Sequence, residues 1–356
     1  MYRSGWGWVW GCSIARSLFF AAAALSCEMP PQGGGASLEH LDAGAFTGRL
    51  LDARSGGTPV FTVVALPDTQ FYAAKFPEIL ESQATWLLEE HQAGDVAFVL
   101  HEGDIVDNDV DQQWVPAAAS LHRLDGIVPY VLSAGNHDYS GDGWSASRGT
   151  LIDAYFPLST FTGSAWFGGT FEADHIENNY ALFDVPGGGQ WLVLSLEFGP
   201  RDEVLAWANA IAQQYASTPA MVVTHAYLYD DDTRYDHTKG TDQHWNPHSY
   251  PIDKAPGGVN DGEEIWQKLI LGNSNIRFVF CGHVVDRGVG RLSSVRPDGT
   301  TVHQVLANYQ MLQRGGDGFL RVMQFFPTLG TVHVQTYSPY LNSLKTDPDN
   351  DFFLAY

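Results

Sequence analysis

Five short apolar segments, each leading into a polar side chain that can bind a metal, constrain this sequence more than any other feature. The segments cover residues 61–66, 96–100, 129–134, 221–224 and 276–281, and they lead into Asp68, Asp104, Asn136, His225 and His283. Apolar runs of this length predict buried strands, and ligands bind at the carboxyl ends of strands in α/β sheets. The sequence therefore predicts one metal site assembled from five strand ends.

The stretches between these segments predict the rest of an α/β domain. Residues 141–169 and 227–262 show no regular pattern. The second stretch is long for a connection without elements of its own, and it is rich in His, Trp and Tyr. We therefore expect it to form a wall or lid over the site, with a passive loop as the alternative. The remaining stretches have helical spacing over 76–92, 109–124, 202–215 and 263–271, and strand-like patterns over 178–185, 190–196 and 291–337.

The first 56 residues have the pattern of an export segment. Arg3 and Arg16 precede an apolar run too short to span a membrane, and Cys27 follows small residues. The expected location is secreted or envelope-anchored, with lipid attachment at Cys27 and simple secretion both left open. The expected divisions are a signal peptide or lipoprotein signal over 1–27, a tether and lead-in over 28–56, and one catalytic domain over 57–356.

The charge balance limits the partners of the chain. A net charge of -22 and a pI near 4.7 argue against a surface for nucleic acid or anionic membrane. No pattern in the sequence indicates an obligate protein partner. Cys281, at the end of the last apolar segment, is expected to pack as a small hydrophobic side chain rather than to bind metal.

Five motifs follow one another along the chain, and together they resemble the calcineurin-like metallophosphoesterase family. The family pattern is D-x-H, G-D-x-x-D, G-N-H-D/E, a lone His and G-H-x-H. The resemblance covers roughly residues 61–337, and it implies a four-layer α-β-β-α sandwich of two mixed β-sheets flanked by helices. It also implies a metal-dependent hydrolase of phosphomonoesters or phosphodiesters. The motifs here are Asp68-Thr-Gln70, Gly103-Asp104-Ile-Val-Asp107, Gly135-Asn136-His137-Asp138, His225 and Gly282-His283-Val-Val285.

The resemblance further implies two metal ions that share Asp104 and a hydroxide derived from water. Asn136, His225 and His283 would complete the position that is intact in this chain. Its mixed nitrogen and oxygen donors suit Zn, Mn or Fe. We therefore expect one firmly bound divalent ion at this position.

The other metal position departs from the family pattern, because Gln70 and Val285 stand where two histidines are expected. Asp68, Gln70 and the shared aspartate would leave an oxygen-only set, which favours a harder ion such as Mg, Mn or Ca, or leaves the position weak or empty. His101 and Asp286 are candidate replacements for the missing imidazoles. We expect a second, weaker ion at this position.

His137 is the expected general acid. In the family, the histidine of G-N-H is not a ligand; it protonates the leaving oxygen after the hydroxide attacks phosphorus. Asp107 would orient it and raise its pKa. The protein phosphatases of the family carry Arg after that aspartate, whereas this chain has Asn108, which argues against a protein phosphatase. Three arginines are candidates for phosphate contacts: Arg148, Arg234 and Arg287.

A different class of function is the alternative. With two family histidines missing, the fold could be a non-catalytic module that binds a glycan or cell-wall polymer through the aromatic residues of 227–262. The intact His137 and Asp107 favour the hydrolase, because a binding module needs no proton donor. The expected partner is accordingly a phosphoester substrate.

Overall fold

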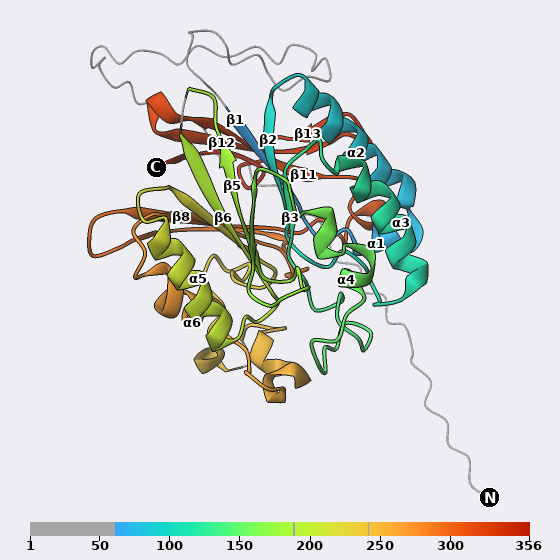
Figure 1. Cartoon of the computed structure of the whole chain (residues 1–356), viewed down its shortest axis with the longest axis horizontal. Coiled ribbons are helices and arrows are strands. Elements are labelled where there is room, and N and C mark those ends of the chain that lie inside the picture. Colours follow the sequence, from blue (N-terminus) through green and yellow to red (C-terminus); the bar gives the residue numbers. More distant parts are fainter. Residues whose placement is uncertain (1–60, 188, 241) are drawn as a thin grey trace, which may run out of the picture. The chain divides into compact units, whose positions relative to one another are not determined.

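The structure is a computed structural model that describes residues 61–187, 189–240 and 242–356. Over these residues two mixed β-sheets pack together, and helices cover their outer faces (Figure 1). The predicted four-layer α/β fold is confirmed, and the described residues all fall in one compact unit. The expected export signal, tether and lead-in of residues 1–56 lie outside the described residues.

The first sheet consists of β1 (Phe61–Leu66), β2 (Val96–His101), β3 (Tyr130–Leu132), β11 (Leu320–Phe326), β12 (Thr331–Ser338), β13 (Ser343–Lys345) and β14 (Asp351–Ala355). Its order is β13-β12-β11-β1-β2-β3, and β14 also pairs with β12. Strands β1, β2 and β3 are parallel, whereas β11 is antiparallel to β1. The carboxyl ends of the three parallel strands therefore meet at one edge.

The second sheet consists of β4 (Phe167–Thr170), β5 (Asn179–Asp184), β6 (Gln190–Leu196), β7 (Ala220–Thr224), β8 (Ile276–Cys281), β9 (Val289–Val295) and β10 (Thr301–Ala307). Its order is β4-β5-β6-β7-β8-β10-β9. Strand β6 is parallel to β7, β7 is parallel to β8, and β8 is parallel to β10. The ends of β7 and β8 therefore also lie together.

The helices include α1 (Gln70–Lys75), α2 (Pro77–Gln92), α3 (Asp111–Leu121), α4 (Ile152–Tyr155), α5 (Asp202–Gln214) and α6 (Gly262–Ile265), with a π-helical turn η6 (Trp266–Ile270) directly after α6. Short 3₁₀ turns are η1 (His122–Leu124), η2 (Leu158–Thr160), η3 (His237–Lys239), η4 (Pro247–Ser249), η5 (Pro251–Lys254), η7 (Gln313–Gly315) and η8 (Pro327–Leu329). Helices α1, α2 and α3 pack on the first sheet, whereas α5 and α6 pack on the second (Figure 1). Within the described part of the chain, no helix is long and apolar enough to cross a membrane.

Alternate side chains of β1 enter different layers, as the two-residue period of a strand requires. Phe61 and Val63 belong to the core between the sheets, together with Met221 of β7. Val64 and Leu66 belong to the core beneath α1, α2 and α3. Both faces of the strand are therefore buried, which explains why this segment is a continuous apolar run.

Residues 227–262, which we call the lid segment, are not structureless as predicted. Apart from residue 241, which is not described, they contain η3, η4, η5 and a bridge between Leu228 and Arg234. Tyr235 and Ile252 are fully buried in the core of the second sheet. Turns of three or four residues are too short to give a periodic apolar signal, so the sequence did not reveal them. The irregular stretch 141–169 likewise contains α4 and η2, and the helix predicted over 263–271 is divided into α6 and η6.

Candidate metal centre

The strand ends bring five predicted ligands to one place. Asp68, Asp104 and Asn136 follow the parallel strands of the first sheet, and His225 and His283 follow β7 and β8. Each of these residues is buried, with at most 6% of its surface exposed. One donor atom from each of Asp68, Asp104 and His225 lies within 4.8 Å of the others. The site therefore holds enough close donors for a metal ion.

Three of these residues have a strained backbone. The φ angle is 26° at Asp68, 51° at Asp104 and 75° at His283, in the left-handed region that residues other than glycine rarely adopt. Such positions cost on the order of 1–3 kcal/mol each and cluster at functional sites. The strain therefore supports a binding role for these side chains independently of any sequence motif.

Two motif glycines allow the strand ends to approach one another. A Cβ atom on Gly135 would lie 2.1 Å from Asp104 Oδ1, and one on Gly282 would lie 2.1 Å from Asp68 Oδ2. Both distances are severe overlaps, so a larger residue would displace a carboxylate. The absence of a side chain at these glycines is therefore needed for the two aspartates to occupy their positions.

Four donor atoms surround what we call the nitrogen-rich position. His225 Nε2 lies 3.2 Å from Asp104 Oδ1 and 3.2 Å from Asn136 Oδ1. The same nitrogen lies 3.1 Å from His283 Nδ1. These three separations, all measured from His225 Nε2, are close to the roughly 3.4 Å between donors of a tetrahedral ion with bonds of about 2.1 Å. Two imidazoles and two oxygens suit Zn, Mn or Fe.

In both imidazoles, one ring nitrogen faces the other donors and the second ring nitrogen is hydrogen-bonded to a backbone carbonyl. His225 Nδ1 lies 2.8 Å from the carbonyl oxygen of Glu102, and His283 Nε2 lies 2.8 Å from that of Trp245. A ring nitrogen that donates its hydrogen to a carbonyl leaves the other nitrogen with a free lone pair for a metal. The sequence could not reveal these partners, because every residue has a carbonyl group.

The charges of the site are those that a cation would balance. Burial raises the pKa of the Asp68 carboxyl well above its usual range. Burial alone would lower the pKa of His225, but the adjacent Asp104 carboxylate outweighs it and raises that pKa to about 9. Burial and the neighbouring His225 lower the pKa of His283 to about 3, so this imidazole is neutral. A divalent ion would replace the proton on His225 and stabilise both carboxylates.

The second group of donors, which we call the oxygen-only position, contains Asp68, Gln70 and the shared Asp104. Gln70, the first residue of α1, donates from Nε2 to Asp107 Oδ1 at 3.1 Å. Its Oε1 is buried and has no hydrogen-bond partner among the described residues. An unsatisfied buried acceptor costs about 1–3 kcal/mol, and a cation would satisfy it. The side chain therefore fits the predicted role of an oxygen ligand.

Neither candidate replacement for the missing imidazoles lies among these donors. His101 Nε2 bonds to Thr69 Oγ1 at 2.9 Å, and its Nδ1 accepts from the Gly103 backbone at 3.2 Å. Both nitrogens of this buried ring are thus used within the protein. Asp286 is exposed, and its carboxylate accepts a hydrogen bond from Tyr229 OH at 3.4 Å. The proposal that either residue replaces a missing histidine is therefore not supported by this geometry.

His137 lies at the edge of the nitrogen-rich position with 26% of its side chain exposed. Its backbone N–H donates to Asp104 Oδ1 at 2.9 Å. Its ring Nδ1 lies 2.8 Å from the backbone carbonyl of Asp107 but 3.8 Å from the carboxylate Oδ1 of the same residue. The ring is therefore held by Asp107 as expected, although through the main chain, while the carboxylate binds Gln70 and Asn108.

The predicted phosphate-contacting arginines are all paired with carboxylates of this chain. A guanidinium has five N–H donors, so a carboxylate partner does not block phosphate but offsets part of the positive charge. These pairs therefore weaken the three residues as phosphate contacts. The pairs are Arg148 with Glu197 at 3.2 Å, Arg234 with Glu263 at 2.7 Å, and Arg287 with Asp349 at 3.4 Å.

Two aromatic side chains flank the expected acid and one ligand. Trp144 is 59% exposed, and its ring centroid lies 5.5 Å from that of Tyr250. Tyr250 in turn lies 6.0 Å from His283. A Cβ on Gly143 would lie 2.3 Å from His137 Cε1, so the chain before Trp144 lies directly against the imidazole. We call Trp144 and Tyr250 the aromatic wall.

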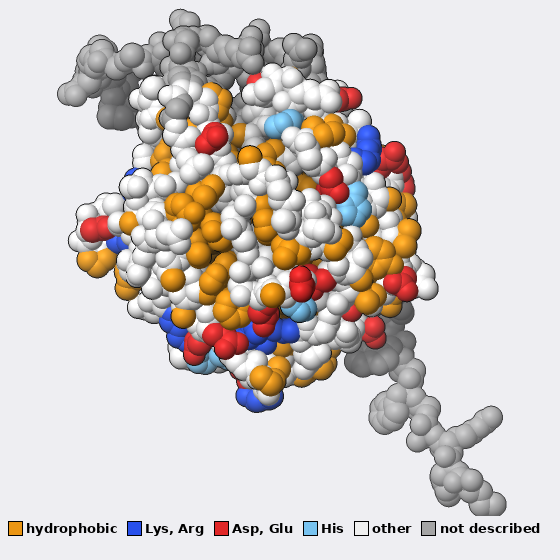
Figure 2. Space-filling view, viewed as in Figure 1, with side chains coloured by type: hydrophobic (Ala, Val, Ile, Leu, Met, Phe, Trp, Pro, Cys, Tyr) orange, Lys and Arg blue, Asp and Glu red, His pale blue; other side chains and the backbone are white. Residues whose placement is uncertain are grey.

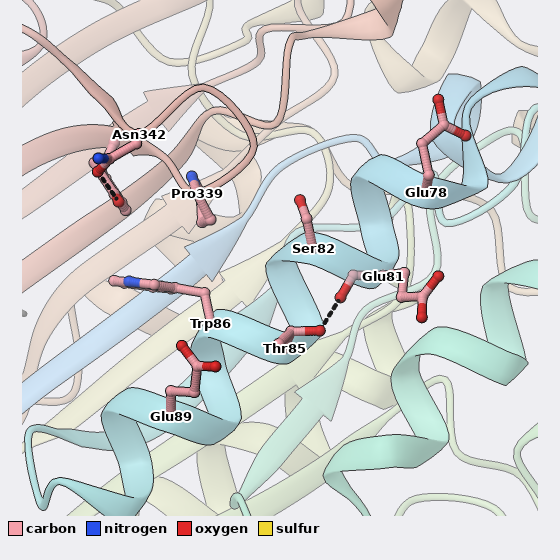
Figure 3. A pocket seen from close by; sticks show the side chains of 9 residues that line it. Glu78, Glu81, Ser82, Thr85, Trp86, Glu89, Pro339 and Asn342 are labelled. Atoms are coloured by element: carbon pink, nitrogen blue, oxygen red, sulfur yellow. Dashed lines mark hydrogen bonds between the residues drawn. The ribbon is translucent and has the colours of Figure 1, made fainter. Parts of the chain in front are cut away.

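Two further views of the described residues show the charge of one face and a pocket apart from this centre. On the face shown in Figure 2, lysine and arginine side chains are few and lie near acidic ones, in keeping with the net charge of -22. The pocket in Figure 3 lies between α2 and the turn after β12, and its wall includes Glu78, Trp86 and Asn342. None of its lining residues is a predicted ligand or acid.

Comparisons with known proteins agree with this geometry. A family model described as calcineurin-like phosphoesterase matches residues 61–287. The uncharacterized protein YvnB of Bacillus subtilis (strain 168) is 31% identical over 303 residues, which are 83% of this chain and 21% of YvnB. The chain thus spans about a fifth of that relative's length.

Two of the solved structures that match this chain have related descriptions. The purple acid phosphatase PPD1 from yellow lupin (Lupinus luteus) seeds is 15% identical, with a TM-score of 0.46 over 84% of this chain and 54% of that one. A predicted phosphoesterase from Streptococcus pneumoniae TIGR4 is 10% identical, with a TM-score of 0.35 over 83% of this chain and 98% of that one. The family match covers more than half of the sequence and includes every strand end described above. The chain therefore belongs to the calcineurin-like phosphoesterase family.

Proposed function

We propose that the chain is a metal-dependent hydrolase of phosphoesters, with His137 as the general acid. The observation that carries the proposal is the convergence of Asp104, Asn136, His225 and His283 beside that imidazole. Donor separations of 3.1 and 3.2 Å support an ion at the nitrogen-rich position. A divalent ion bound there supplies a Lewis acid for phosphoryl oxygens and lowers the pKa of water.

Residues at the nitrogen-rich position also place the general acid. Asp104 accepts the His137 backbone N–H at 2.9 Å, so the shared ligand also places the acid. The Asp107 carbonyl holds Nδ1 of the same ring, which leaves Nε2 as the nitrogen that donates a proton to the leaving oxygen. This arrangement supports ester cleavage rather than binding alone.

The aromatic wall supports an ester with an organic leaving group. Trp144 offers an exposed ring, and the backbone at Gly143 directly before it lies against the acid, near which a leaving group must lie when it is protonated. A flat or apolar group would bury against this ring, whereas inorganic phosphate would gain nothing from it. The choice between monoester and diester is an outcome of the substrate test below.

For residues 1–27 we keep the proposal of an export signal, with release or lipid anchoring at Cys27. Its support is the arrangement of Arg3, Arg16 and the apolar run that follows. Mass spectrometry of the protein from membrane and culture fractions would test it. An intact first residue on cytoplasmic protein would contradict the proposal.

The catalytic proposal is tested with the purified full chain, after removal of metal and reloading with Mn²⁺ or Zn²⁺. We expect the reloaded protein to hydrolyse 4-nitrophenyl phosphate, bis(4-nitrophenyl) phosphate or both, and the metal-free protein to be inactive. His333→Ala on β12 is a matched control, because it removes an imidazole that pairs with Asp351 away from the site. Failure of the loaded protein on a broad phosphoester panel, together with binding of a glycan polymer, would favour the binding module.

A further inference from the structure

A second cluster of metal-binding side chains lies in and beside the lid segment. One donor atom each from His237, His248, Asp261 and Glu264 lies within 4.8 Å of the other three. The two imidazole rings have centroids 4.2 Å apart. The side chains come from η3, η4, and the beginning of α6, so the cluster joins three separate turns. None of its members belongs to the metal centre described above.

Close contacts already pair each imidazole with a carboxylate. His237 Nδ1 lies 3.0 Å from Asp261 Oδ2, and His248 Nε2 lies 2.7 Å from Glu264 Oε2. Two nitrogens and two carboxylate oxygens are a four-ligand set suited to zinc, with bonds of about 2.0–2.2 Å. Donors of such an ion lie roughly 3.4 Å apart. The four donor atoms of the cluster lie within 4.8 Å of one another, so these side chains need to move only a short distance towards the ion.

The two carboxylates are fixed in place by the beginning of α6. Asp261 Oδ1 accepts the Glu264 backbone N–H at 3.1 Å, and Glu264 Oε2 accepts the Asp261 backbone N–H at 3.1 Å. Asn246 also donates to Asp261 Oδ2, at 3.2 Å. Asp261 is fully buried, whereas 42% of the His237 side chain is exposed. The acceptors are therefore preorganised, and an ion has a route to them from solvent.

The charges around the cluster favour a cation. A third carboxylate, Asp253, lies 2.8 Å from His248 Nδ1 and is paired with Lys254. Lys268 lies 3.5 Å from the other Glu264 oxygen, Oε1. A divalent ion would displace the protons that the imidazoles share with Asp261 and Glu264. Its affinity should therefore fall as the pH is lowered.

The cluster is connected to the metal centre through the lid segment. Trp245 stands between the two histidines in sequence, and its carbonyl accepts the Nε2–H of His283 at 2.8 Å. Fixing His237 and His248 to α6 therefore restrains the segment that orients a ligand of the nitrogen-rich position. Loss of such an outer contact typically weakens metal binding by about 10–100-fold.

We propose that His237, His248, Asp261 and Glu264 bind a zinc-class divalent ion that fastens the lid segment to α6. The ion is structural, because all four donors come from the protein and complete a tetrahedral set. It is separate from the ion at the nitrogen-rich position and does not depend on the proposed hydrolase activity. Its only effect on that centre is to keep the Trp245 carbonyl against His283.

The test counts ions and needs no substrate. The full chain is stripped of metal, reloaded with Zn²⁺, freed of unbound ion and subjected to element analysis. We expect Glu264→Gln to lower the bound zinc by one equivalent, both in the natural chain and in the His225→Ala variant. Gln keeps an oxygen that can accept the Asp261 N–H, so this variant retains the start of α6. His237→Ala, which changes a side chain 42% exposed, should have the same effect.

Cobalt and a control variant make the result decisive. When Co²⁺ replaces Zn²⁺, the His225→Ala protein should still show the strong visible absorption of four-coordinate cobalt. The double variant His225→Ala with Glu264→Gln should lose that absorption. The matched control is His333→Ala, which removes an imidazole paired with Asp351 on β12 and should leave the zinc count unchanged. An unchanged count in both Glu264→Gln and His237→Ala, with native circular dichroism, would overturn the proposal. So would a His225→Ala protein that holds no four-coordinate cobalt.

Discussion

The nitrogen-rich and oxygen-only positions share Asp104 but differ in every other donor. The first contains two imidazoles, and a backbone carbonyl orients each ring. The second contains the Asp68 carboxylate and the neutral amide oxygen of Gln70, whose orientation depends on one hydrogen bond to Asp107. Both positions are formed by ends of parallel strands, so the difference between them lies in side-chain chemistry rather than in the fold.

This comparison indicates that a centre of this kind can lose ligands on one side without losing its framework. The glycine before Asn136 and the glycine before His283 still leave room for both aspartates. The strained φ angles are found at Asp68 as well as at Asp104. The affinities should nevertheless be unequal, because imidazole binds first-row divalent ions more tightly than a neutral amide oxygen does.

The largest effect is expected from His225→Ala, which removes the imidazole nearest to three other donors. The nitrogen-rich position should lose its ion, and turnover should fall on the order of a thousand-fold or more because the Lewis acid is lost. Element analysis and hydrolysis of 4-nitrophenyl esters would measure both effects, with His333→Ala as control. Retention of full activity would mean that the oxygen-only position supports the reaction.

His137→Ala should slow turnover without changing the ion count. Removal of a general acid costs roughly a hundred- to ten-thousand-fold, and less when the leaving group is a good one. The loss should therefore be larger for an alkyl ester than for a 4-nitrophenyl ester, as steady-state rates on the two substrates would reveal. Equal losses on both substrates would assign His137 to structure, since its backbone also bonds Asp104.

The sequence predicted the strands well, and it predicted that the side chains at their ends lie together, because both depend on local patterns. The run from Phe61 to Leu66 is buried on both faces, so it is apolar throughout, and Asp68 follows directly. The hydrogen bonds of His101 could not be predicted, because strand alternation alone does not show that Thr69 and Gly103 bind its two ring nitrogens. The same limit applies to long-range carbonyl contacts such as that of Trp245. They depend on where the lid segment packs, and no periodic pattern encodes that position.

Gln70→His combined with Val285→His should make the two positions more alike. The double variant restores both imidazoles of the family pattern, and we expect tightly bound metal at this centre to rise by up to one equivalent. Gln70→Ala alone should lower metal content only slightly, because a neutral amide is a weak ligand. Dialysis followed by element analysis compares the three proteins. If the natural chain already holds both ions of this centre as tightly as the double variant does, the positions are equal and the comparison is wrong.

The smallest effect is expected from Trp144→Ala, which tests on which side of the centre the substrate lies. Trp144 is mostly exposed, so its removal should change the free energy of unfolding by no more than about 0.5 kcal/mol. Loss of ring contact with an aryl leaving group should raise KM a few-fold, because an aromatic pair contributes about 0.5–1.5 kcal/mol. Trp144→Phe should restore part of the affinity, and KM for a small alkyl ester should change little.

Tyr250 connects Trp144 to His283 through ring contacts of 5.5 and 6.0 Å, which places the wall beside the nitrogen-rich position. Trp144→Ala should therefore raise KM by the same factor in the Gln70→Ala protein as in the natural chain. If Trp144→Ala no longer raises KM in the Gln70→Ala protein, the leaving group lies over the oxygen-only position instead.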